Sequence, residues 1–400
     1  MYPTLYHFFH DVFGVDGTAW QVLKIINSFG FFVAIAFIVA NRTLKLEFIR
    51  MEKMGFLKTG SKKVVSGLAP NPVDIAGSAL IGFILGYKFV YLFMHATEAF
   101  GGDSRPQELL LSLSGNWPAG IILAALFGWM RWREAKKLQL PEPLTETVTV
   151  HPYEHTGNIT MVAAIAGIAG AKLFHLIENP DQFIQFFTNP TVDSFLSGLT
   201  VYGGLIVGGF SVWYYVKKNC HIPTLRLVDA AAPGLMLAYG IGRIGCQVSG
   251  DGDWGIVNTS PKPGWMSWLP DWLWAYDYPN NVNGVGELIT SGPCYEGYCT
   301  HLVPAVFPTP VYETTMATII FLILWYLRKK ISIPGFIFAI YLMFNGLERF
   351  LIEGIRVNVK MHALGLTFTQ AQLISVLTFI AGVIMMWWLY SRHQKNEKLS

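Results

Sequence analysis

Apolar residues in this chain gather into long blocks, without the short amphipathic periods of a soluble domain. Each block is close to the roughly 20 residues that an α-helix needs to cross a bilayer core. We therefore expect a membrane-spanning helix from each of nine blocks. They are residues 19–41, 73–98, 115–132, 158–178, 196–216, 227–248, 310–327, 332–351 and 369–390. The pattern predicts an all-α polytopic membrane protein in which residues 1–400 form a single integral membrane domain.

Basic residues are distributed between the blocks in a way that predicts an orientation. Cytoplasmic loops of membrane proteins are enriched in lysine and arginine. Basic clusters follow every second block, at 42–63, 131–137, 217–226, 328–330 and 392–398. If the helices alternate in direction, all of these clusters lie on one side. We predict that this side is cytoplasmic, that the N-terminus is outside and the C-terminus inside, and that residues 249–309 form a periplasmic loop.

Composition agrees with a membrane protein. The chain is 52% hydrophobic and only 14% charged, whereas soluble domains contain roughly 25% charged residues. The net charge of +3 follows from the basic loops and gives no reason to expect nucleic-acid binding. Residues 1–18 lack the basic start of a cleavable signal peptide. An amphipathic segment on the outer surface and a disordered tail are both compatible with them.

The predicted outer loop, 249–309, is rich in tryptophan and contains two closely spaced cysteines. Its tryptophans could form an aromatic belt at the headgroup level, or a cap that helps to admit lipid or peptide. Cys294 and Cys299 predict a disulfide, because the outer compartment is oxidising. We expect no metal site, since additional cysteine or histidine ligands at suitable spacing are absent, and we expect no other cofactor.

Two parts of the chain resemble each other. The segment IGFILGYKFVYLF (81–93) is similar to AGIAGAKLFHLI (166–177), and each is followed by a glycine-rich block. The equivalent positions, each pair 84 residues apart, are Gly86 and Gly170, Lys88 and Lys172, and Gly120 and Gly204. We infer a duplicated two-helix hairpin, with an extra copy at 73–132 and a core copy at 158–218. Chance similarity between glycine-rich spans is the alternative.

The stretch GIGRIG (240–245) matches the glycine pattern G-x-G-x-x-G of dinucleotide-binding proteins. That interpretation requires a preceding strand and a surrounding βαβ unit, but here the stretch ends an apolar membrane block. The glycines instead allow neighbouring helices or a ligand to approach Arg243. The polar run after it is expected to break the helix beside a cavity. An arginine at such a place can hold two phosphate oxygens with its planar guanidinium group.

Two further polar groups are expected on the same side of the membrane. In FNGLERFLIEGIRVN (344–358), one helical face would present Asn345, Arg349, Glu353 and Arg356. Tyr312 and Glu313 begin the block after the outer loop. Charges within a bilayer are costly and usually face a partner or a cavity. Interhelical salt bridges would account for each group separately, but the convergence of three groups favours a site.

Five segments together resemble the prolipoprotein diacylglyceryl transferase family of bacterial inner-membrane enzymes. GRIGCQVSGDGDWG resembles the family signature, and RFLIEGIR resembles a second family motif. FPTPVYE is similar to a third motif, and GAKLFHLI followed by YGGLIVGGF resembles a further pair. The family has seven helices, so nine blocks would correspond to the family fold plus one added hairpin. In this family a lipobox cysteine thiol attacks the glyceryl carbon of phosphatidylglycerol, and glycerol phosphate leaves.

The resemblance implies partners and site residues. The partners are phosphatidylglycerol, prolipoprotein signal peptides with a lipobox cysteine, and the surrounding lipids, with the active site facing the outer leaflet. Arg243 and Arg349 are expected to contact phosphate, and Tyr202 and Glu353 to act beside them in catalysis. The expected substrate-binding positions are Lys172, Gly203, Gly204, Gly245, Asp251, Gly255, Tyr312, Glu313, Asn345 and Arg356.

The chain departs from the family at four motif positions. Tyr202 and Phe307 replace histidines, Cys246 replaces an asparagine and Asp251 replaces a glutamate. The histidine replaced by Tyr202 is the obvious base for the thiol. Tyr202 either takes that role, with Lys172 favouring its phenolate, or merely fills the space.

The departures leave a second class of function open. A non-catalytic lipid-binding protein, or an anion or lipid transporter, would also contain buried cations and a duplicated hairpin. A transporter would place its site near the midplane of the bilayer. The polar groups here gather toward the outer leaflet, and we therefore favour a transferase.

Overall fold

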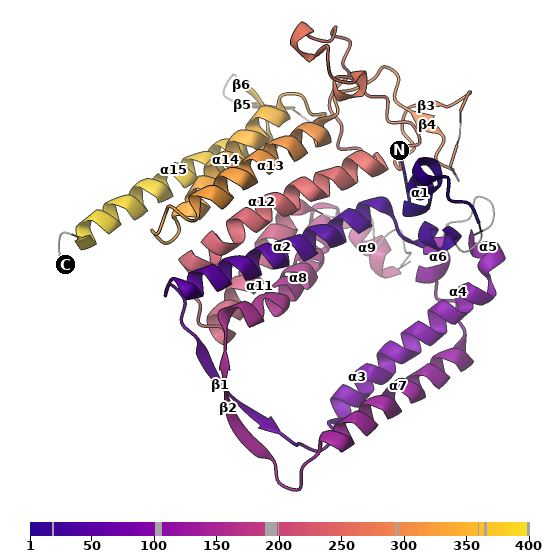
Figure 1. The fold of residues 1–400 in the computed structure, drawn as a ribbon. Coiled ribbons are helices and arrows are strands. Elements are labelled where there is room, and N and C mark those ends of the chain that lie inside the picture. Colours follow the sequence, from indigo (N-terminus) through magenta and orange to yellow (C-terminus); the bar gives the residue numbers. More distant parts are fainter. Residues whose placement is uncertain are drawn as a thin grey trace.

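The structure is a computed structural model of the chain, and it describes residues 1–17, 20–100, 106–188, 198, 200–292, 294–295, 297–358, 360–363 and 366–397. Each of the nine predicted blocks overlaps a long helix, although the first residues of block 196–216 lie outside the described residues. The first block, 19–41, is shifted: its long helix starts at Ser28 and continues to Lys53, into the predicted basic loop. The long helices are α2 (Ser28–Lys53), α3 (Pro72–Leu85) continued by the π-helical turn η2 (Gly86–Val90) and α4 (Tyr91–Met94), α7 (Trp117–Leu138), α8 (Thr156–Glu178), α11 (Val201–Asn219), α12 (Thr224–Ser249), α13 (Thr309–Leu327), α14 (Phe336–Glu353) and α15 (Gln370–Glu397). Figure 1 shows α2, α8, α11, α12, α13, α14 and α15 grouped in a bundle, whereas α3, η2, α4 and α7 form a hairpin apart from it.

Length and composition make six of the described helices suitable for crossing a membrane. These six include α2, α8, α12, α13 and α15, and the continuous helix at Pro72–Met94. The other predicted blocks form α7, α11 and α14, which are helical but do not meet these limits. In α14 the last turns contain three charged residues, Glu348, Arg349 and Glu353.

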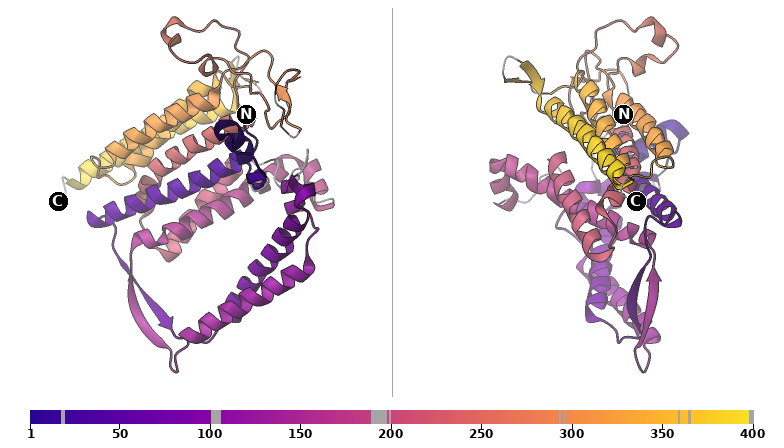
Figure 2. Two further views of the ribbon diagram at one scale, coloured as in Figure 1. Left: turned by 45° about the vertical axis from the view of Figure 1, so that its right-hand side comes forward. Right: turned by 90° about the vertical axis from the view of Figure 1, so that its left-hand side faces the viewer.

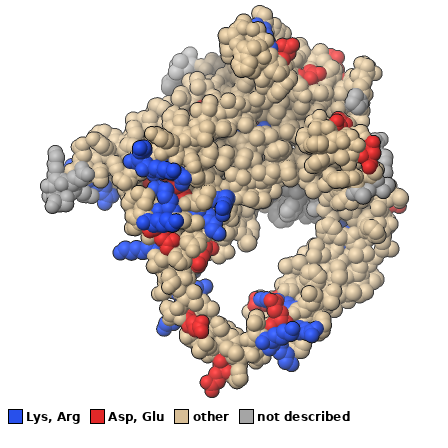
Figure 3. Space-filling model, in the orientation of Figure 1, with Lys and Arg blue, Asp and Glu red and all other residues tan. Residues whose placement is uncertain are grey.

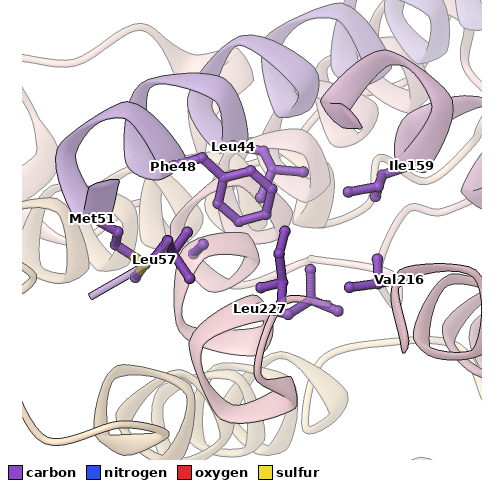
Figure 4. Packing of buried hydrophobic residues seen from close by; sticks show 9 residues of the cluster. Leu44, Phe48, Met51, Leu57, Ile159, Val216 and Leu227 are labelled. Carbon is purple, nitrogen blue, oxygen red and sulfur yellow. The ribbon is translucent and has the colours of Figure 1, made fainter. Parts of the chain in front are cut away.

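Helix α12 is the centre of the main bundle. It packs against α2 on one side and against α13 and α14 on the other, and α15 covers α14. Helices α8 and α11 form a close pair that contacts α2. Figure 4 shows the apolar core at one end of the bundle, where Phe48, Ile159, Val216 and Leu227 from four different helices meet.

A buried carboxylate fixes α14 relative to α12. Asp229 of α12 accepts hydrogen bonds from the backbone amides of Gly335 at 2.6 Å and Phe338 at 2.9 Å. These amides belong to the start of α14, where backbone donors have no partner within the helix. A carboxylate there also interacts favourably with the positive end of the helix dipole. The contact aligns the two helices that carry the basic residues of the site below.

Residues 58–150 leave the main bundle and return to it as an arm. Strand β1 (Gly60–Ser66) pairs with β2 (Leu144–Val150) in an antiparallel ribbon, and α3 and α7 form a hairpin at its far end (Figure 1). The left view of Figure 2 shows this hairpin beside the body, and the space-filling view in Figure 3 shows an open gap between them. The arm also contacts the N-terminal part of the chain. Lys24 of η1 (Trp20–Ile25) is buried and donates to the carbonyl oxygen of Phe100 at 3.0 Å.

Strands were not expected from the sequence. The described residues contain three two-stranded sheets, so the prediction of an all-α fold holds only for the helical bulk of the molecule. The sequences GSKKVVS and LTETVTV are rich in valine and threonine, which favour strands. The other pairs are short: β3 (Glu287–Leu288) with β4 (Thr300–His301), and β5 (Lys360–Ala363) with β6 (Leu366–Thr369).

The N-terminal segment and the loop 249–309 cover the same end of the bundle. The N-terminal segment, for which an amphipathic segment and a disordered tail were both open, contains helix α1 (Leu5–Phe13). The loop has a small core of Tyr278, Leu302 and Val306. The predicted disulfide between Cys294 and Cys299 is present.

Close helix contacts in the arm and in the body occupy equivalent positions. A Cβ atom at Gly86 would lie 2.3 Å from the carbonyl oxygen of Ala119, and one at Gly170 would lie 2.5 Å from that of Gly203. Glycine at these positions lets the paired helices approach closely, as in other membrane helix pairs.

We expect Gly86→Ala to lower the melting temperature of the purified protein in detergent, because the added methyl group pushes α3 away from α7. Overpacking of this kind costs about 1–3 kcal/mol. Gly77→Ala, on the same helix with no atom within 4 Å of the added Cβ, is the matched control and should not lower it. Equal melting temperatures for the two variants would show that the glycine contact does not hold the hairpin together.

Candidate functional site

Three arginines meet on one buried carboxylate. Glu313, in the second turn of α13, has a side chain with 0% exposure. Its carboxylate lies 3.3 Å from Nε of Arg243, 3.4 Å from Nη1 of Arg349 and 3.2 Å from Nη1 of Arg356. The structure therefore brings together four residues that the sequence analysis had singled out in three separate segments.

Asp253 joins two of the same arginines and was missed by the sequence analysis. One carboxylate oxygen of Asp253 pairs with Arg243 and the other with Arg356. The thiol of Cys246 donates to the oxygen that pairs with Arg243, with Sγ and Oδ2 3.3 Å apart. Asp253 lies two residues after Asp251 in the same polar run. Its position in that run is the feature of the sequence that could have indicated it as a site residue.

Two more polar side chains complete the buried network. The hydroxyl of Tyr239 donates to Glu313 at 2.9 Å and lies 3.4 Å from Glu348, and the guanidinium of Arg243 stands over the Tyr239 ring, 5.1 Å from its centroid. Tyr239 lies one helical turn before Arg243, and Glu348 directly precedes Arg349, so their positions could have indicated them. Glu348 is buried, with 2% exposure, and Tyr239 is half-buried.

Glu353 anchors Arg349 from the end of α14. Its carboxylate lies 3.3 Å from Nη2 of Arg349. The same carboxylate accepts hydrogen bonds from the hydroxyl of Thr369 at 2.7 Å and from the side-chain amide of Asn358. Glu353 thus orients an arginine and is itself held on two further sides.

The backbone near the site differs from the expectation in two places. The sequence suggested that Arg356 continues the helical stripe of α14, but α14 ends at Glu353. Arg356 lies in an extended segment that pairs with Gly255. The polar run after Arg243 was expected to break α12, but the helix continues to Ser249 and ends at Gly250, which has a φ of 69°. Arg243 and Cys246 are therefore on helical backbone, and only Asp253 comes from the loop.

Gly255 makes the approach of the loop to Arg356 possible. A Cβ atom at this position would lie 2.6 Å from the carbonyl oxygen of Ile355 and 2.8 Å from the side chain of Phe307. The amide of Gly255 donates to the carbonyl oxygen of Phe307 at 2.8 Å. Gly255 is therefore at a position where the loop packs too closely against its neighbours to admit a side chain.

Tyr202 and its neighbours lie on the α8/α11 pair. Tyr202 is in the first turn of α11, and its side chain is 39% exposed. Within the described part of the chain, no hydrogen bond or ion pair joins Tyr202 to the arginine cluster. Gly203 packs against α8, because a Cβ there would lie 2.4 Å from the carbonyl oxygen of Gly170. Gly204 faces the same helix, and Lys172 lies on it.

The remaining expected residues surround the cluster in different ways. Gly245 packs against Phe32 of α2, and Asn345 is half-buried one turn before Arg349 on α14. Burial raises the pKa of Asp251 to about 6, and the nearby Asp253 carboxylate adds to the increase. Burial alone would raise the pKa of Asp253 as well, but Arg243 and Arg356 outweigh it and hold that pKa below its usual value.

A cavity of about 580 Å³ adjoins the cluster on the side of the tryptophan-rich loop. It is lined by Trp265, Trp274, Phe307, Tyr312 and Ile355, among other apolar residues. The hydroxyl of Tyr312 donates to the carbonyl oxygen of Leu273 at 2.7 Å and ties the loop to α13. Two of its lining residues, Tyr312 and Ile355, directly precede Glu313 and Arg356 in the chain, so the cavity lies near the cluster without being lined by it.

The cluster lies near one end of the bundle. Arg243 is six residues before the end of α12, or about 9 Å at 1.5 Å per residue, and Arg349 is in the last two turns of α14. Such a position suits access from one surface better than access from both. No group of three or more histidine, cysteine or carboxylate side chains suitable for a metal ion occurs among the described residues. The arrangement is best suited to hold an anion by its arginines.

Comparison with known proteins gives consistent matches. The family described as prolipoprotein diacylglyceryl transferase matches residues 117–388. A phosphatidylglycerol–prolipoprotein diacylglyceryl transferase of Bifidobacterium adolescentis is 29% identical over 59% of this chain and 68% of its own length. Proteins of the same name from Clostridium tetani and Corynebacterium efficiens are 28% and 30% identical, over 58% and 56% of this chain and 80% and 65% of their own lengths.

Removing the charge of Glu313 should strongly destabilise the protein. Glu313→Gln would leave three clustered arginines without their shared counter-ion, and breaking a buried ion pair costs about 3–5 kcal/mol. Thermal unfolding in detergent measures the effect, with Glu287→Gln in the exposed outer loop as the matched control. A melting temperature for Glu313→Gln equal to that of the control would mean that the cluster does not depend on this carboxylate.

Proposed function

The chain belongs to the prolipoprotein diacylglyceryl transferase family, and we propose that its arginine cluster holds the phosphate of the lipid substrate. The protein transfers the diacylglyceryl group of phosphatidylglycerol to prolipoproteins, and it is a multi-pass membrane protein. The observation that carries the site assignment is the convergence of Arg243, Arg349 and Arg356 on Glu313. The following paragraphs concern how these residues perform the transfer.

The reaction exchanges one bond for another at a glyceryl carbon. The thiol of the lipobox cysteine loses its proton, and its sulfur forms a bond to the glyceryl carbon of phosphatidylglycerol. The bond between that carbon and the phosphate oxygen breaks, and glycerol phosphate leaves with the bonding electron pair. Negative charge therefore develops on the phosphate as the reaction proceeds.

Fixed cations around the phosphate stabilise that developing charge. Preorganised donors aimed at a developing anion are usually among the largest contributions to catalysis. Arg243 and Arg349 are held by Glu313 and Glu353 before substrate arrives, so that little reorganisation is needed when the phosphate binds. Their planar guanidinium groups can each bind two phosphate oxygens.

Two residues are candidates to accept the proton of the thiol. Tyr202 occupies the position of the family histidine, and Lys172 lies on the neighbouring helix. Asp251 is closer to the arginine cluster along the chain, and a carboxylate with a pKa of about 6 is suited to act as a base near neutral pH. The location of Asp251 and its raised pKa favour it over Tyr202.

We place the site at the outer leaflet of the bacterial inner membrane. Nine helices would span the bilayer, with the N-terminus and the loop 249–309 in the periplasm and the C-terminus in the cytoplasm. Figure 3 supports this orientation, because lysine and arginine gather at the ends of the helices opposite the loop. Trp265 and Trp268 are 73% and 79% exposed, as expected for side chains at the headgroup level.

The arm hairpin and the α8/α11 pair fit a duplication. The backbone amide of Asn116 donates to the carbonyl oxygen of Tyr87 at 2.8 Å, and the amide of Thr200 donates to that of Ala171 at 3.1 Å. Each of these donors and acceptors is 84 residues from its equivalent. The close glycine contacts of the two hairpins have the same offset.

Substitution of lysine for either arginine should slow the transfer severely. In purified protein with phosphatidylglycerol and a lipobox peptide, we expect Arg243→Lys and Arg349→Lys each to reduce turnover about 10²-fold, the usual effect of losing one donor to a developing anion. Arg392→Lys, at the far end of α15, is the control and should leave turnover unchanged. Near wild-type turnover in both site variants would disprove the phosphate-holding role.

The pH dependence of the transfer identifies the base. If Asp251 accepts the proton, the rate rises as the pH increases through about 6, and Asp251→Asn removes that limb while lowering turnover about 10²-fold. Tyr202→Phe should then be nearly silent. If instead Tyr202→Phe abolishes turnover and Tyr202→His restores it, Tyr202 is the base and Asp251 is not.

A further inference from the structure

We propose that Asp253 occupies the phosphate position of the empty site and that the phosphodiester of the lipid displaces it. This inference rests on the proposed function of the arginine cluster, and it adds Arg356 to Arg243 and Arg349 as a residue that holds the phosphate. The carboxylate of Asp253 bridges Arg243 and Arg356, with one oxygen toward each. A phosphodiester presents two anionic oxygens in a similar arrangement.

Exposure distinguishes Asp253 from the other carboxylates that pair with the arginines. The side chains of Glu313 and Glu353 are both 0% exposed, whereas that of Asp253 is 28% exposed. Asp253 therefore lies at the mouth of the site, where an incoming anion arrives first. Glu313 and Glu353 lie behind the arginines and have further hydrogen-bond donors, Tyr239 and Thr369.

Charge also favours an exchange of one anion for another. The ion-paired groups are three arginines and the carboxylates of Asp253, Glu313 and Glu353. When Asp253 turns away, Arg243 and Arg356 each lose one of their two counter-ions and keep only Glu313, and leaving buried charges less completely paired is costly. The phosphodiester of phosphatidylglycerol carries one negative charge and restores the balance. A neutral lipid cannot replace the carboxylate in this way.

The backbone around Asp253 allows the side chain to move without the loop. The hydroxyl of Thr309 donates to the carbonyl oxygen of Asp253 at 2.6 Å, and Gly255 is held by Phe307. The main chain is thus fixed at Asp253 and two residues after it, and the exchange requires only rotation of a short side chain. Besides the two arginines, the side chain of Asp253 has the weak thiol donor of Cys246 as a partner in the described structure.

Cys246 provides a reporter for the displacement. Its thiol donates to Asp253 in the empty site. When the lipid phosphate takes the place of the carboxylate, the acceptor becomes a phosphodiester oxygen, which is a weaker base and a weaker hydrogen-bond acceptor than a carboxylate oxygen. Cys220 and Cys246 are the free cysteines of the chain, since Cys294 and Cys299 form the disulfide. In a Cys220→Ser background, the S–H stretching band in the infrared spectrum therefore comes from Cys246 alone.

The first experiment adds phosphatidylglycerol to Cys220→Ser protein in phosphate-free detergent. We expect the S–H band to shift to higher wavenumber, as a weaker hydrogen bond requires, with no shift upon addition of diacylglycerol, which lacks the phosphate. Inorganic phosphate serves as a second probe and should produce the same shift if the anion alone displaces Asp253. An unchanged band at saturating phosphatidylglycerol, or an equal shift with diacylglycerol, would overturn the proposal. A shift with inorganic phosphate but not with the lipid would overturn the assignment to a lipid phosphodiester.

The second experiment measures binding of radiolabelled phosphatidylglycerol to Asp253→Asn. Removal of the competing internal anion should tighten binding about tenfold, the lower end of the effect of one charge-assisted hydrogen bond. A merely structural role would weaken binding. Asp271→Asn, which removes the same charge from an exposed position of the same loop, is the matched control and should have no effect. Unchanged or weaker binding by a folded Asp253→Asn would contradict the proposal.

These measurements separate the inference from the proposed function. Both detect binding, whereas the function is tested by transfer of the diacylglyceryl group. A protein that transfers the group while its S–H band remains unchanged would retain the function and lose the inference. A protein whose band shifts but that transfers nothing would retain the exchange at Asp253 and lose the assigned role of the arginines in catalysis.

Discussion

The site depends on one carboxylate that holds three positive charges inside a membrane protein. Arginine is costly in an apolar environment unless it is paired, and Glu313 pairs with Arg243, Arg349 and Arg356 at once. The contact also connects α12, α13 and the end of α14. The same interaction that makes the cations tolerable therefore fixes the relative positions of the helices that carry them.

Much of the surrounding structure keeps this contact in place. Asp229 aligns α14 with α12 at the other end of the two helices, and Glu353 fixes the direction of Arg349. The outer loop contributes Asp253 and, through Gly255, brings its backbone against Arg356. The loop is consequently part of the site and more than a connection between α12 and α13.

The helices were predictable from the sequence because long apolar blocks have few other folds available to them in a membrane. Arg243, Arg349 and Glu313 were predictable for a related reason, because charged side chains in apolar membrane blocks usually pair with a partner or face a cavity. Arg356 was assigned to a helix because its spacing fits one, but α14 ends at Glu353, where Gly354 follows as its C-cap; glycine at this place is a common end of a helix. Asp253 was missed because its importance comes from two arginines that are distant in sequence. The ribbon of β1 and β2 was missed because both strands lie between predicted membrane blocks, in two segments that had been assigned to loops. Their valine and threonine residues were therefore not considered as a strand pattern.

The equivalent glycine contacts of the arm and the body have a consequence for biosynthesis. Because Gly86 and Gly170 offer similar surfaces to a partner helix, α3 could pair with α11 as well as with α7, and exchange of similar elements is a characteristic error of repeat proteins. The order of translation works against this error, since α7 emerges long before α11. Pairing of β1 with β2 joins the two ends of the arm, so that α3 and α7 belong to a unit that is separate in sequence from the α8/α11 pair.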